Sequence, residues 1–279
     1  MNINNTLLAL IHNNNDQRNT YIRPKLAKLI EDCSQIKGPV IEVYFHGEIP
    51  HGTLMTFMRE ALKRKYDREW SRYRLIKPVF LPWDVASFVK STIVKYLFNH
   101  TNLQKLMKLS AIEVVHSDEH VRAWTTFLQS DAEFLICFED DAVFKEDSSQ
   151  RIFDLINLLS GSKGRGPTYI DLAGGCKLDD LGVGKLELNH DANFRHYSKP
   201  ITNTACVYLM NRSLITSLHS ILAQRPWIRL IQIDHMLNKL FMIMEEELKV
   251  TCMHTEPSVF NHGSVTGEYA SGLEFGRYK

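Results

Sequence analysis

The sequence predicts an α/β domain in which helices flank a mixed, mostly parallel central sheet. Short apolar runs that suit buried strands alternate along the chain with longer segments whose apolar residues recur at helical spacing. Strands joined by helices favour parallel pairing, because a parallel pair needs a long crossover connection. No repeat and no clean linker divides the 279 residues, so we expect a single domain over 1–279.

The first part of the chain reads as strand, helix, strand, helix. Residues 6–12 (TLLALIH) form a short apolar run closed by asparagines, which predicts a buried strand and a turn. Residues 24–33 carry apolar side chains at helical spacing, with Pro24 in the first turn. Residues 38–47 predict a second strand, and residues 53–73 predict a helix that is strongly basic toward its end.

The middle of the chain leads to an acidic segment. Residues 85–109 and 115–128 predict two helices, the second with Ser117 or Asp118 as its N-cap. Residues 134–138 (FLICF) predict a buried strand that ends directly in three carboxylates. Beyond it we expect a helix over 152–159, a strand over 168–175, a surface loop over 176–198, a strand over 205–210, a helix over 212–223 and a helix that opens at Asp234.

Composition limits the kinds of partner and of compartment. Lys plus Arg number 33 against 32 for Asp plus Glu, so the net charge of +1 does not favour nucleic acid. The five cysteines are scattered without a C-x-x-C pair, which indicates buried thiols in a reducing compartment and no structural zinc. No run approaches the roughly 18 apolar residues of a membrane span and the N-terminus has no basic leader, so we expect a cytoplasmic protein.

The acidic triplet Glu139, Asp140 and Asp141 interrupts an otherwise apolar stretch, FLICFEDDAVF. In an extended segment side chains two residues apart point the same way, so Glu139 and Asp141 should converge and Asp140 should point away. Converging carboxylates favour a cation between them, and magnesium or manganese prefers oxygen ligands. The alternative is a solvated turn in which Asp141 caps the next element. Ligands of open α/β sheets bind beyond the carboxyl ends of strands, which is where the triplet lies.

Four motifs carry a resemblance to a known family. LALIHNNNDQR, HSDEHVRAW, FLICFEDDAVF and NTACVYLMNRSLI followed by IQIDHML resemble glycosyltransferases of the A-type fold. The closest resemblance is to the lipopolysaccharide-modifying family, number twenty-five of the usual sequence classification, which includes collagen galactosyltransferases. The matched positions include Asn13, Arg18, His120 and Trp124, whereas the basic region 53–74 has no counterpart there.

The resemblance implies a Rossmann-like fold and a metal-dependent transfer of a sugar from a nucleotide-diphosphate donor, a UDP-sugar above all, to a glycan hydroxyl. It implies Mn²⁺ or Mg²⁺ bridging the acids and the diphosphate, with a donor and metal half over 1–150 and an acceptor half over 151–279. The implied metal ligands are Glu139, Asp141 and His262, with His254 as the second choice of histidine. Asp141 is the expected direct ligand, and Glu139 or Asp140 is available to the ribose.

The resemblance also implies residues for the donor and for proton transfer. The expected donor contacts are His12, Asn13, Arg18, His116, Glu139 and Asp140, with Thr204 as a further candidate and Trp227 and Tyr269 as stacking aromatics. For an inverting transfer, Asp234 is the expected general base. Its alternative role is a plain helix N-cap, and the alternative bases are Asp171, Asp179 and Asp180.

Two rival functions and one further partner stay open from the sequence. A nucleotidyltransferase would also use paired carboxylates, but the chain has no P-loop pattern to hold a triphosphate. A glycan-binding or assembly protein on a decayed transferase fold would not depend on Asp141. The basic residues within 59–74 indicate either a solvated helix face or a peripheral contact with an acceptor or a membrane surface.

Overall fold

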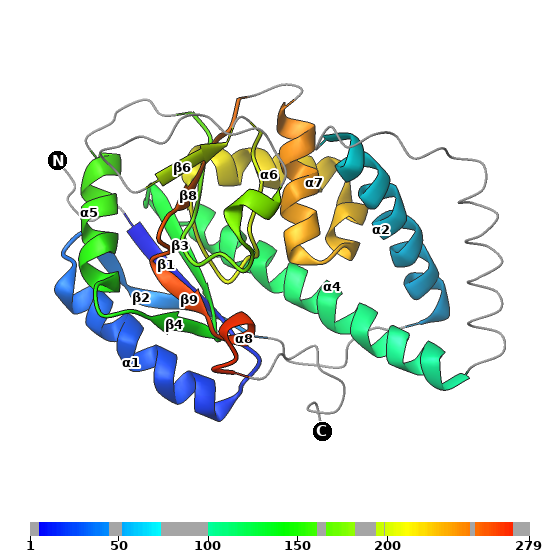
Figure 1. The fold of residues 1–279 in the computed structure, drawn as a ribbon, viewed down its shortest axis with the longest axis horizontal. Coiled ribbons are helices and arrows are strands. Elements are labelled where there is room, and N and C mark those ends of the chain that lie inside the picture. The colour runs from blue at the N-terminus through cyan, green and yellow to red at the C-terminus, as the bar shows by residue number, and fades with distance from the viewer. Residues whose placement is uncertain are drawn as a thin grey trace.

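A computed structural model describes residues 6–44, 52–73, 100–160, 166–181, 194–197, 199–245 and 249–269. Its centre is a seven-stranded sheet in the order β2-β1-β3-β7-β5-β8-β6. Five strands run in one direction, and β7 and β6 run against them (Figure 1). The strands are β1 (Thr6–Ile11), β2 (Ile36–Val43), β3 (Phe134–Glu139), β5 (Thr168–Asp171), β6 (Phe194–Tyr197), β7 (Val207–Asn211) and β8 (Thr251–Thr255).

The prediction of a mixed, mostly parallel, Rossmann-like sheet flanked by helices is confirmed. The sheet takes strands from both halves of the chain, since β3 of the first half pairs with β7 of the second. A second, two-stranded sheet joins β4 (Ala142–Phe144) to β9 (Phe260–His262) in antiparallel register. This small sheet brings the C-terminal part of the chain beside the acidic segment.

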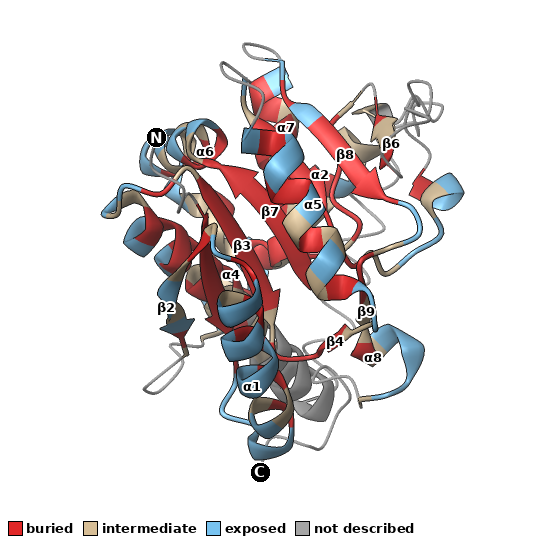
Figure 2. Ribbon diagram, turned by 90° about the vertical axis from the view of Figure 1, so that its left-hand side faces the viewer, coloured by how far each residue is buried: buried red, intermediate tan, exposed pale blue. Residues whose placement is uncertain are grey.

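Two layers of helices cover the sheet because its strands alternate their side chains between two faces. On β1, Leu8 and Leu10 pack toward α1 (Asp16–Asp32) and α5 (Ser148–Ser160). On the same strand, Ala9 and Ile11 pack toward the opposite layer. Figure 2 shows the buried strands behind α1 and α5. The opposite layer contains α4 (His100–Leu128), α6 (Arg212–Gln224) and α7 (Ile233–Glu245).

Short helices and one outer helix complete the described structure. The predicted helix α2 (Thr53–Tyr73) is confirmed, and it contacts α4 and α7 outside the main layers. The remaining short helices are η1 (Leu178–Leu181), η2 (Pro226–Leu230) and α8 (Gly263–Thr266). Within the described residues, no helix is both long and apolar enough to cross a bilayer.

Helix α1 begins earlier than the sequence predicts. Asn15 is its N-cap, and the Asn15 side chain accepts a hydrogen bond from the Arg18 amide. Pro24 therefore lies inside the helix and not in its first turn, so that part of the prediction is wrong. The early start follows from the cap, since the asparagine satisfies an amide that the first turn leaves free.

Helix α4 is continuous where the sequence predicts a break and a new N-cap. Ser117 lies in its interior, buried, and its hydroxyl donates to the carbonyl oxygens of Glu113 and, at 2.7 Å, of Ile231. The predicted cap at Ser117 or Asp118 is therefore wrong, because Ser117 bonds a carbonyl of the preceding turn and a neighbouring segment instead. Of the other predicted helix, over 85–109, residues 85–99 lie outside the described residues.

Strands β6, β8 and β9 have no counterpart among the predicted elements. The predicted surface loop over 176–198 contains β6, and residues 182–193 of it lie outside the described part of the chain. Each of these strands is short, and polar side chains interrupt its apolar pattern, as in TCMHT and FNH. Strand β8 pairs with β5, β6 pairs with β8, and β9 pairs with β4. This pairing holds them in extended form and is a property of the tertiary structure.

Candidate active site at the carboxyl end of strand β3

The three acids stand at the carboxyl end of an inner strand of the sheet. Glu139 is the last residue of β3, opposite Ile11 at the end of β1, and its amide donates to the carbonyl oxygen of Cys206. The chain turns at Asp140 and Asp141 before β4 begins. Asp140 and Asp141 are 5% and 4% exposed, so the interpretation of this segment as a solvated turn is wrong.

Asp140 binds both the loop that follows β1 and the first turn of α1. The Arg18 guanidinium donates to Asp140 Oδ1 at 2.7 Å, and both side chains are buried. The Asn13 amide donates to Asp140 Oδ2 at 3.3 Å. The guanidinium also lies over the ring of Tyr269, 5.3 Å from its centroid. The structure thus brings together Asn13, Arg18 and Asp140, which the sequence predicts as donor contacts, with Tyr269 beside them.

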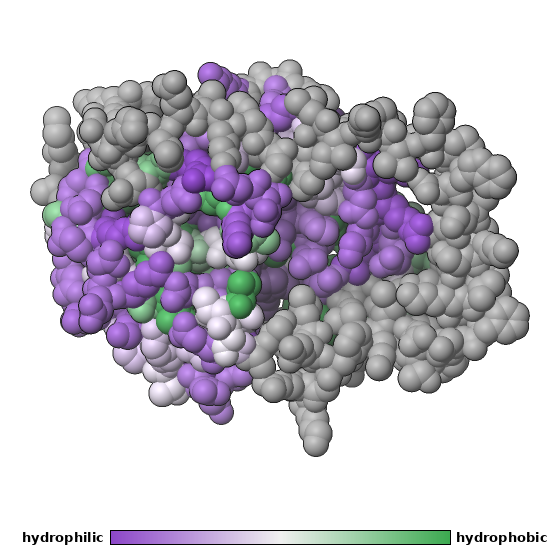
Figure 3. Space-filling view, in the orientation of Figure 1, coloured by the Kyte–Doolittle hydropathy of each residue, from purple (hydrophilic) through white to green (hydrophobic). Residues whose placement is uncertain are grey.

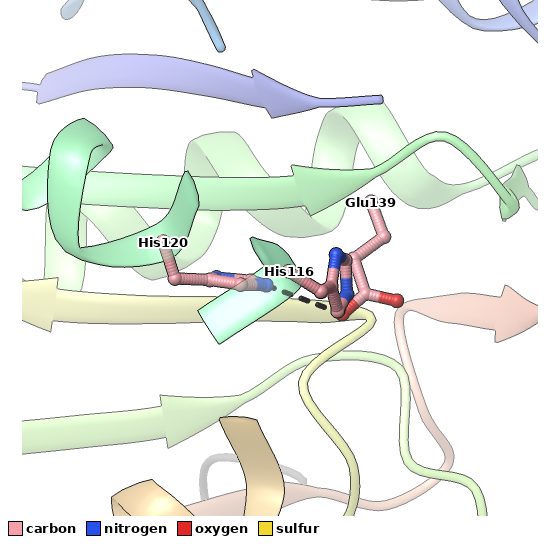
Figure 4. A group of neighbouring side chains, drawn as sticks. All are labelled: His116, His120 and Glu139. Atoms are coloured by element: carbon pink, nitrogen blue, oxygen red, sulfur yellow. Dashed lines mark hydrogen bonds and ion pairs between the residues drawn. The ribbon is translucent and has the colours of Figure 1, made fainter. Parts of the chain in front are cut away.

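Glu139 faces helix α4. Its Oε1 lies 3.0 Å from Nε2 of His116 and 3.3 Å from Nε2 of His120. Figure 4 shows both imidazoles directed at the Glu139 carboxylate at the end of its strand. His120 is fully buried, whereas His116 is half-buried. The histidines come from one helix and the glutamate from the strand packed against it, so this group forms by packing of α4 on the sheet.

These three groups shift the pKa values of one another. Burial by itself lowers the pKa of His116, but Glu139 and Glu119 overcome that effect and hold it well above the usual value. Burial dominates at His120 and lowers its pKa to about 4, so this imidazole is neutral at pH 7. Burial opposes ionisation of Glu139, yet the two histidines hold the pKa of Glu139 well below its usual range.

Asp141 faces the C-terminal segment. Nε2 of His262 lies 3.2 Å from Asp141 Oδ2, and the Ser264 hydroxyl donates to the same oxygen. The Cys206 thiol donates to Asp141 Oδ1 at 3.5 Å. Burial lowers the pKa of His262, but the Asp141 carboxylate outweighs it and raises the value. The converse contact with His262 lowers the pKa of Asp141 against the effect of burial.

Backbone geometry brings His262 to this place. Ala142 pairs with His262 across the small sheet, and the Gly263 amide donates to the carbonyl oxygen of Asp141. A Cβ at Gly263 would lie 2.7 Å from that oxygen, so only glycine allows this approach. On the other side, Nδ1 of His262 lies 3.3 Å from the hydroxyl of Thr204, whose φ of +76° is rare for a β-branched residue. His262 therefore sits between Asp141 and Thr204.

The predicted metal ligands divide between two neighbouring groups. One contains His116, His120 and Glu139, and the other contains Asp141, Cys206 and His262. The expected convergence of Glu139 and Asp141 is not what the structure shows. It assumed an extended chain through all three acids, but the strand ends at Glu139 and the turn directs Asp141 elsewhere.

The donor sets of the two groups suit different ions. Asp141 and His262 supply an ionised oxygen and an imidazole nitrogen, which fit Mn²⁺. Burial and the nearby carboxylates raise the pKa of Cys206 well above its usual value, so it stays a thiol and is a poor ligand for a hard cation. Asp141 and His262 thus fit an ion that also keeps substrate oxygens or water in its shell.

Asp234 lies in the first turn of α7, near both groups. The backbone amide of Ala205 binds its carboxylate, but its buried Oδ1 has no hydrogen-bond partner among the described residues. Burial, reinforced by the charge of Glu139, raises the Asp234 pKa to about 7, while His116 and His262 act in the opposite direction. Helix α7 begins at Ile233, so Asp234 does not stand at the N-cap position. A half-ionised carboxylate with an unpaired oxygen is suited to accept a proton.

Asp171, another candidate base, is already committed to hydrogen bonds. Its Oδ1 accepts from the Gly174 amide at 2.8 Å, and its Oδ2 accepts from the Asn203 amide and the Tyr169 hydroxyl. Burial raises the Asp171 pKa to about 7 even though these donors favour the charged form. Asp171 therefore orders the loops behind the site. The candidate bases Asp179 and Asp180 are exposed, and Asp179 pairs with Arg195.

Replacing Asp171 with alanine should cost about 3 kcal/mol of unfolding free energy, because two buried amides would lose their acceptor. Urea denaturation followed by circular dichroism measures the loss. The matched control is Asp179→Ala, an exposed aspartate of the same loop region, which should change stability by less than about 0.5 kcal/mol. Equal stabilities of the two variants would contradict the structural role of Asp171.

The second-choice metal ligand, His254, lies away from both groups. It is buried on β8, where Nε2 lies 2.9 Å from the carbonyl oxygen of Ile201, and burial lowers its pKa to about 4. Its ring contacts the rings of Tyr169 and Tyr197 in the core. His254 is thus a core histidine, and the structure favours His262, the first choice, for the Asp141 group.

His12 is a buried residue that binds the loop after β1. It is buried, its ring stacks on Tyr44 at 5.0 Å, and its Nδ1 accepts from the Asn14 amide. Burial is the largest influence on its pKa, which is lowered. Trp227, the second predicted stacking aromatic, lies under the ammonium of Lys65 on α2.

The structure adds residues that the sequence did not assign to the site. His120, Ser264 and Cys206 lie within the two groups. His120 had a readable signal, since it follows His116 by four residues and a helix places such residues on one face. Ser264 and Cys206 had none, because they follow β9 and precede β7, and only the pairing of these strands with β4 and β3 brings them to Asp141.

Comparison of the chain with known proteins gives no match to a protein-family model and none to a curated protein.

Proposed function

We propose that this protein is a metal-dependent glycosyltransferase. It moves a sugar from a nucleotide-diphosphate donor, a UDP-sugar in our proposal, to a hydroxyl of a glycan acceptor with inversion at the anomeric carbon. The observation that carries the proposal is the combination of the Asp141–His262 pair with Asp234, a carboxylate that keeps an unpaired buried oxygen. The motifs that resemble the A-type glycosyltransferases support the same conclusion.

Asp141 and His262 would hold Mn²⁺ or Mg²⁺ in this proposal. When bound, the ion supplies neutralisation of the charge that develops on the leaving diphosphate. Asp140 holds the start of α1 through Arg18 and the preceding loop through the Asn13 amide, so the exposed Asn13 is held at the edge of the site. In this proposal Asn13, with His12 behind it, contacts the nucleoside, and Asp140 keeps the loop in place through the Asn13 amide.

Asp234 would act as the base. Its Oδ1 has no hydrogen-bond partner among the described side chains, so it is free to accept the proton of the attacking hydroxyl. A pKa of about 7 leaves about half of the molecules ionised at neutral pH, which suits a general base. Asp171 is unsuited to this role because both of its oxygens already accept hydrogen bonds.

The basic helix α2 is our candidate surface for contact with the acceptor. Figure 3 shows mostly hydrophilic surface over this helix. Arg59 does not contribute to it, because it is buried and paired with Glu113, so its inclusion in a predicted contact surface is wrong. Lys65 is exposed and Lys63 half-buried. We keep an acceptor or peripheral membrane contact through the rest of 59–74 as part of the proposal, although Arg74 lies outside the described residues.

UDP together with Mn²⁺ should raise the melting temperature, and neither should do so alone. A ligand at 100 times its dissociation constant stabilises the folded state by about 2.7 kcal/mol. For a chain of this size, that stabilisation raises the melting temperature by roughly 5 °C. A thermal-shift panel of UDP, GDP and CDP, each with Mn²⁺ or EDTA, measures it. Release of UDP from UDP-sugars in the presence of candidate glycans then measures transfer.

A matched variant controls for unspecific ion binding in this panel. Asp147→Asn changes an exposed aspartate outside the site and should leave the UDP–Mn²⁺ shift intact. The absence of a shift with any nucleotide would contradict the proposed function. A shift without UDP release from any sugar nucleotide would favour a non-catalytic glycan-binding protein.

A further inference from the structure

Two imidazole nitrogens converge on one carboxylate oxygen at the end of β3. Nε2 of His116 and Nε2 of His120 lie 3.0 Å and 3.3 Å from the same Oε1 of Glu139. All three ligand atoms lie within 4.8 Å of one another. Both histidines belong to helix α4, and the planes of their rings are nearly perpendicular, at 83° (Figure 4).

These separations suit a shared metal ion. Ligands about 2.1 Å from a tetrahedral ion lie roughly 3.4 Å from one another, close to the observed N–O distances. Two imidazoles and one carboxylate are also a donor set that zinc and similar ions prefer over magnesium or calcium. The group therefore needs only small movements of its side chains to bind an ion of this class.

Each histidine has a second partner that directs its Nε2 toward Glu139. Nδ1 of His116 lies 3.4 Å from Oε2 of Glu119, and Nδ1 of His120 lies 2.6 Å from the hydroxyl of Tyr208. Metal-binding histidines characteristically bond their other ring nitrogen to a carboxylate or a similar group, which fixes the ring. Tyr208 is fixed in turn by the indole of Trp124, which donates to its hydroxyl at 3.1 Å.

The spacing of the histidines agrees with this arrangement. His116 and His120 are four residues apart on α4, and Glu119 lies between them in HSDEH. Two histidines at this spacing on one helix, with a glutamate between them, are a pattern that zinc enzymes use.

We propose that His116, His120 and Glu139 form a second metal site that binds Zn²⁺ or a similar transition-metal ion, with the remaining coordination position open to water. Glu119 and Tyr208 are its positioning residues. The site is separate from the Asp141–His262 pair and does not depend on the proposed sugar transfer. It assigns Glu139 to this ion and leaves Asp141 and His262 to the donor ion. Without an ion, His116 lies within ion-pair distance of both Glu119 and Glu139.

Metal titration of the stripped protein tests the site. After treatment with a chelator, isothermal titration with Zn²⁺ and the visible absorption of bound Co²⁺ should both report a site in the unmodified protein. His116→Ala should weaken binding by more than about 100-fold, beyond the usual effect of an outer partner. Glu119→Gln should weaken it by roughly 10- to 100-fold. Circular dichroism checks that each variant is folded. We expect His116→Ala to fold, because the His116 side chain is only half-buried.

Two controls separate this site from the donor-ion pair and from stray surface histidines. His219→Ala removes a half-buried histidine on α6, and Asp141→Asn removes the ligand of the other group. Both variants should keep the Zn²⁺ affinity and the Co²⁺ spectrum. No Zn²⁺ binding in the unmodified protein, equal affinity after His116→Ala, or loss of the site after Asp141→Asn would each overturn the proposal. Because metal binding is measured without a nucleotide, the result tests the second metal site independently of the proposed glycosyl transfer.

Discussion

Replacement of Asp141 with asparagine should reduce metal-dependent transfer by about 10³-fold or more. A divalent ion contributes several kcal/mol to the stabilisation of a leaving diphosphate, and each 1.36 kcal/mol corresponds to a factor of ten in rate. The amide removes the negative charge while it keeps the shape of the side chain, so the contact with Ser264 can persist. Release of UDP, measured as kcat over a range of Mn²⁺ concentrations, gives the effect.

The Asp141 variant should also lose the stabilisation by UDP with Mn²⁺. Its secondary structure should be unchanged, since the turn is also held by the hydrogen bond from the Gly263 amide to the Asp141 carbonyl oxygen. Asp147→Asn, the exposed control, should keep full activity. Full activity of Asp141→Asn in the presence of EDTA would show that this carboxylate holds no ion needed for the reaction.

Replacement of Asp234 with asparagine should lower turnover by roughly 10²- to 10⁴-fold, the usual contribution of a general base. Binding of UDP with Mn²⁺ should change little, because the metal pair of Asp141 and His262 is intact. Initial rates and thermal shifts on the same preparation separate these two effects. Near-normal turnover would place the base elsewhere.

The pH dependence of the unmodified protein supplies a second check on Asp234. Burial and Glu139 raise its pKa to about 7, and the ionised form is the active one, so kcat/KM should rise with pH through about 7 and then level off. The raised pKa also means that the folded state loses stability as pH rises toward and through 7. Asp234→Asn should therefore melt at a higher temperature than the unmodified protein at pH 8, and a lower melting temperature would contradict this environment.

Local periodicity is what the sequence shows well. The apolar runs FLICF and TLLALI predict the inner strands β3 and β1, and the acids that follow mark the carboxyl end of β3. The basic helix over 53–73 has the predicted bounds. These features depend on residues close in sequence. They are visible as apolar side chains that recur every two residues in a strand or every 3.6 residues in a helix.

Departures from the predictions occur where a distant partner determines local structure. Ser117 has the residue type of a helix cap, yet it lies inside α4, where its hydroxyl bonds the carbonyl oxygen of Ile231, 114 residues away. The short strands β8 and β9 form because β5 and β4 offer them free edges. A pattern read along the chain contains no record of such partners.

The sequence by itself determined that three acids end a buried strand of an α/β sheet, since both facts follow from the order of neighbouring residues. Only the tertiary structure decided which groups those acids meet: Glu139 meets two histidines of α4, Asp140 meets Arg18, and Asp141 meets His262. The reason is the turn at Asp140 and Asp141, which ends the strand's alternation and sends adjacent carboxylates to separate elements. Those elements come together by packing and strand pairing, forces that act across the fold and leave no local periodicity.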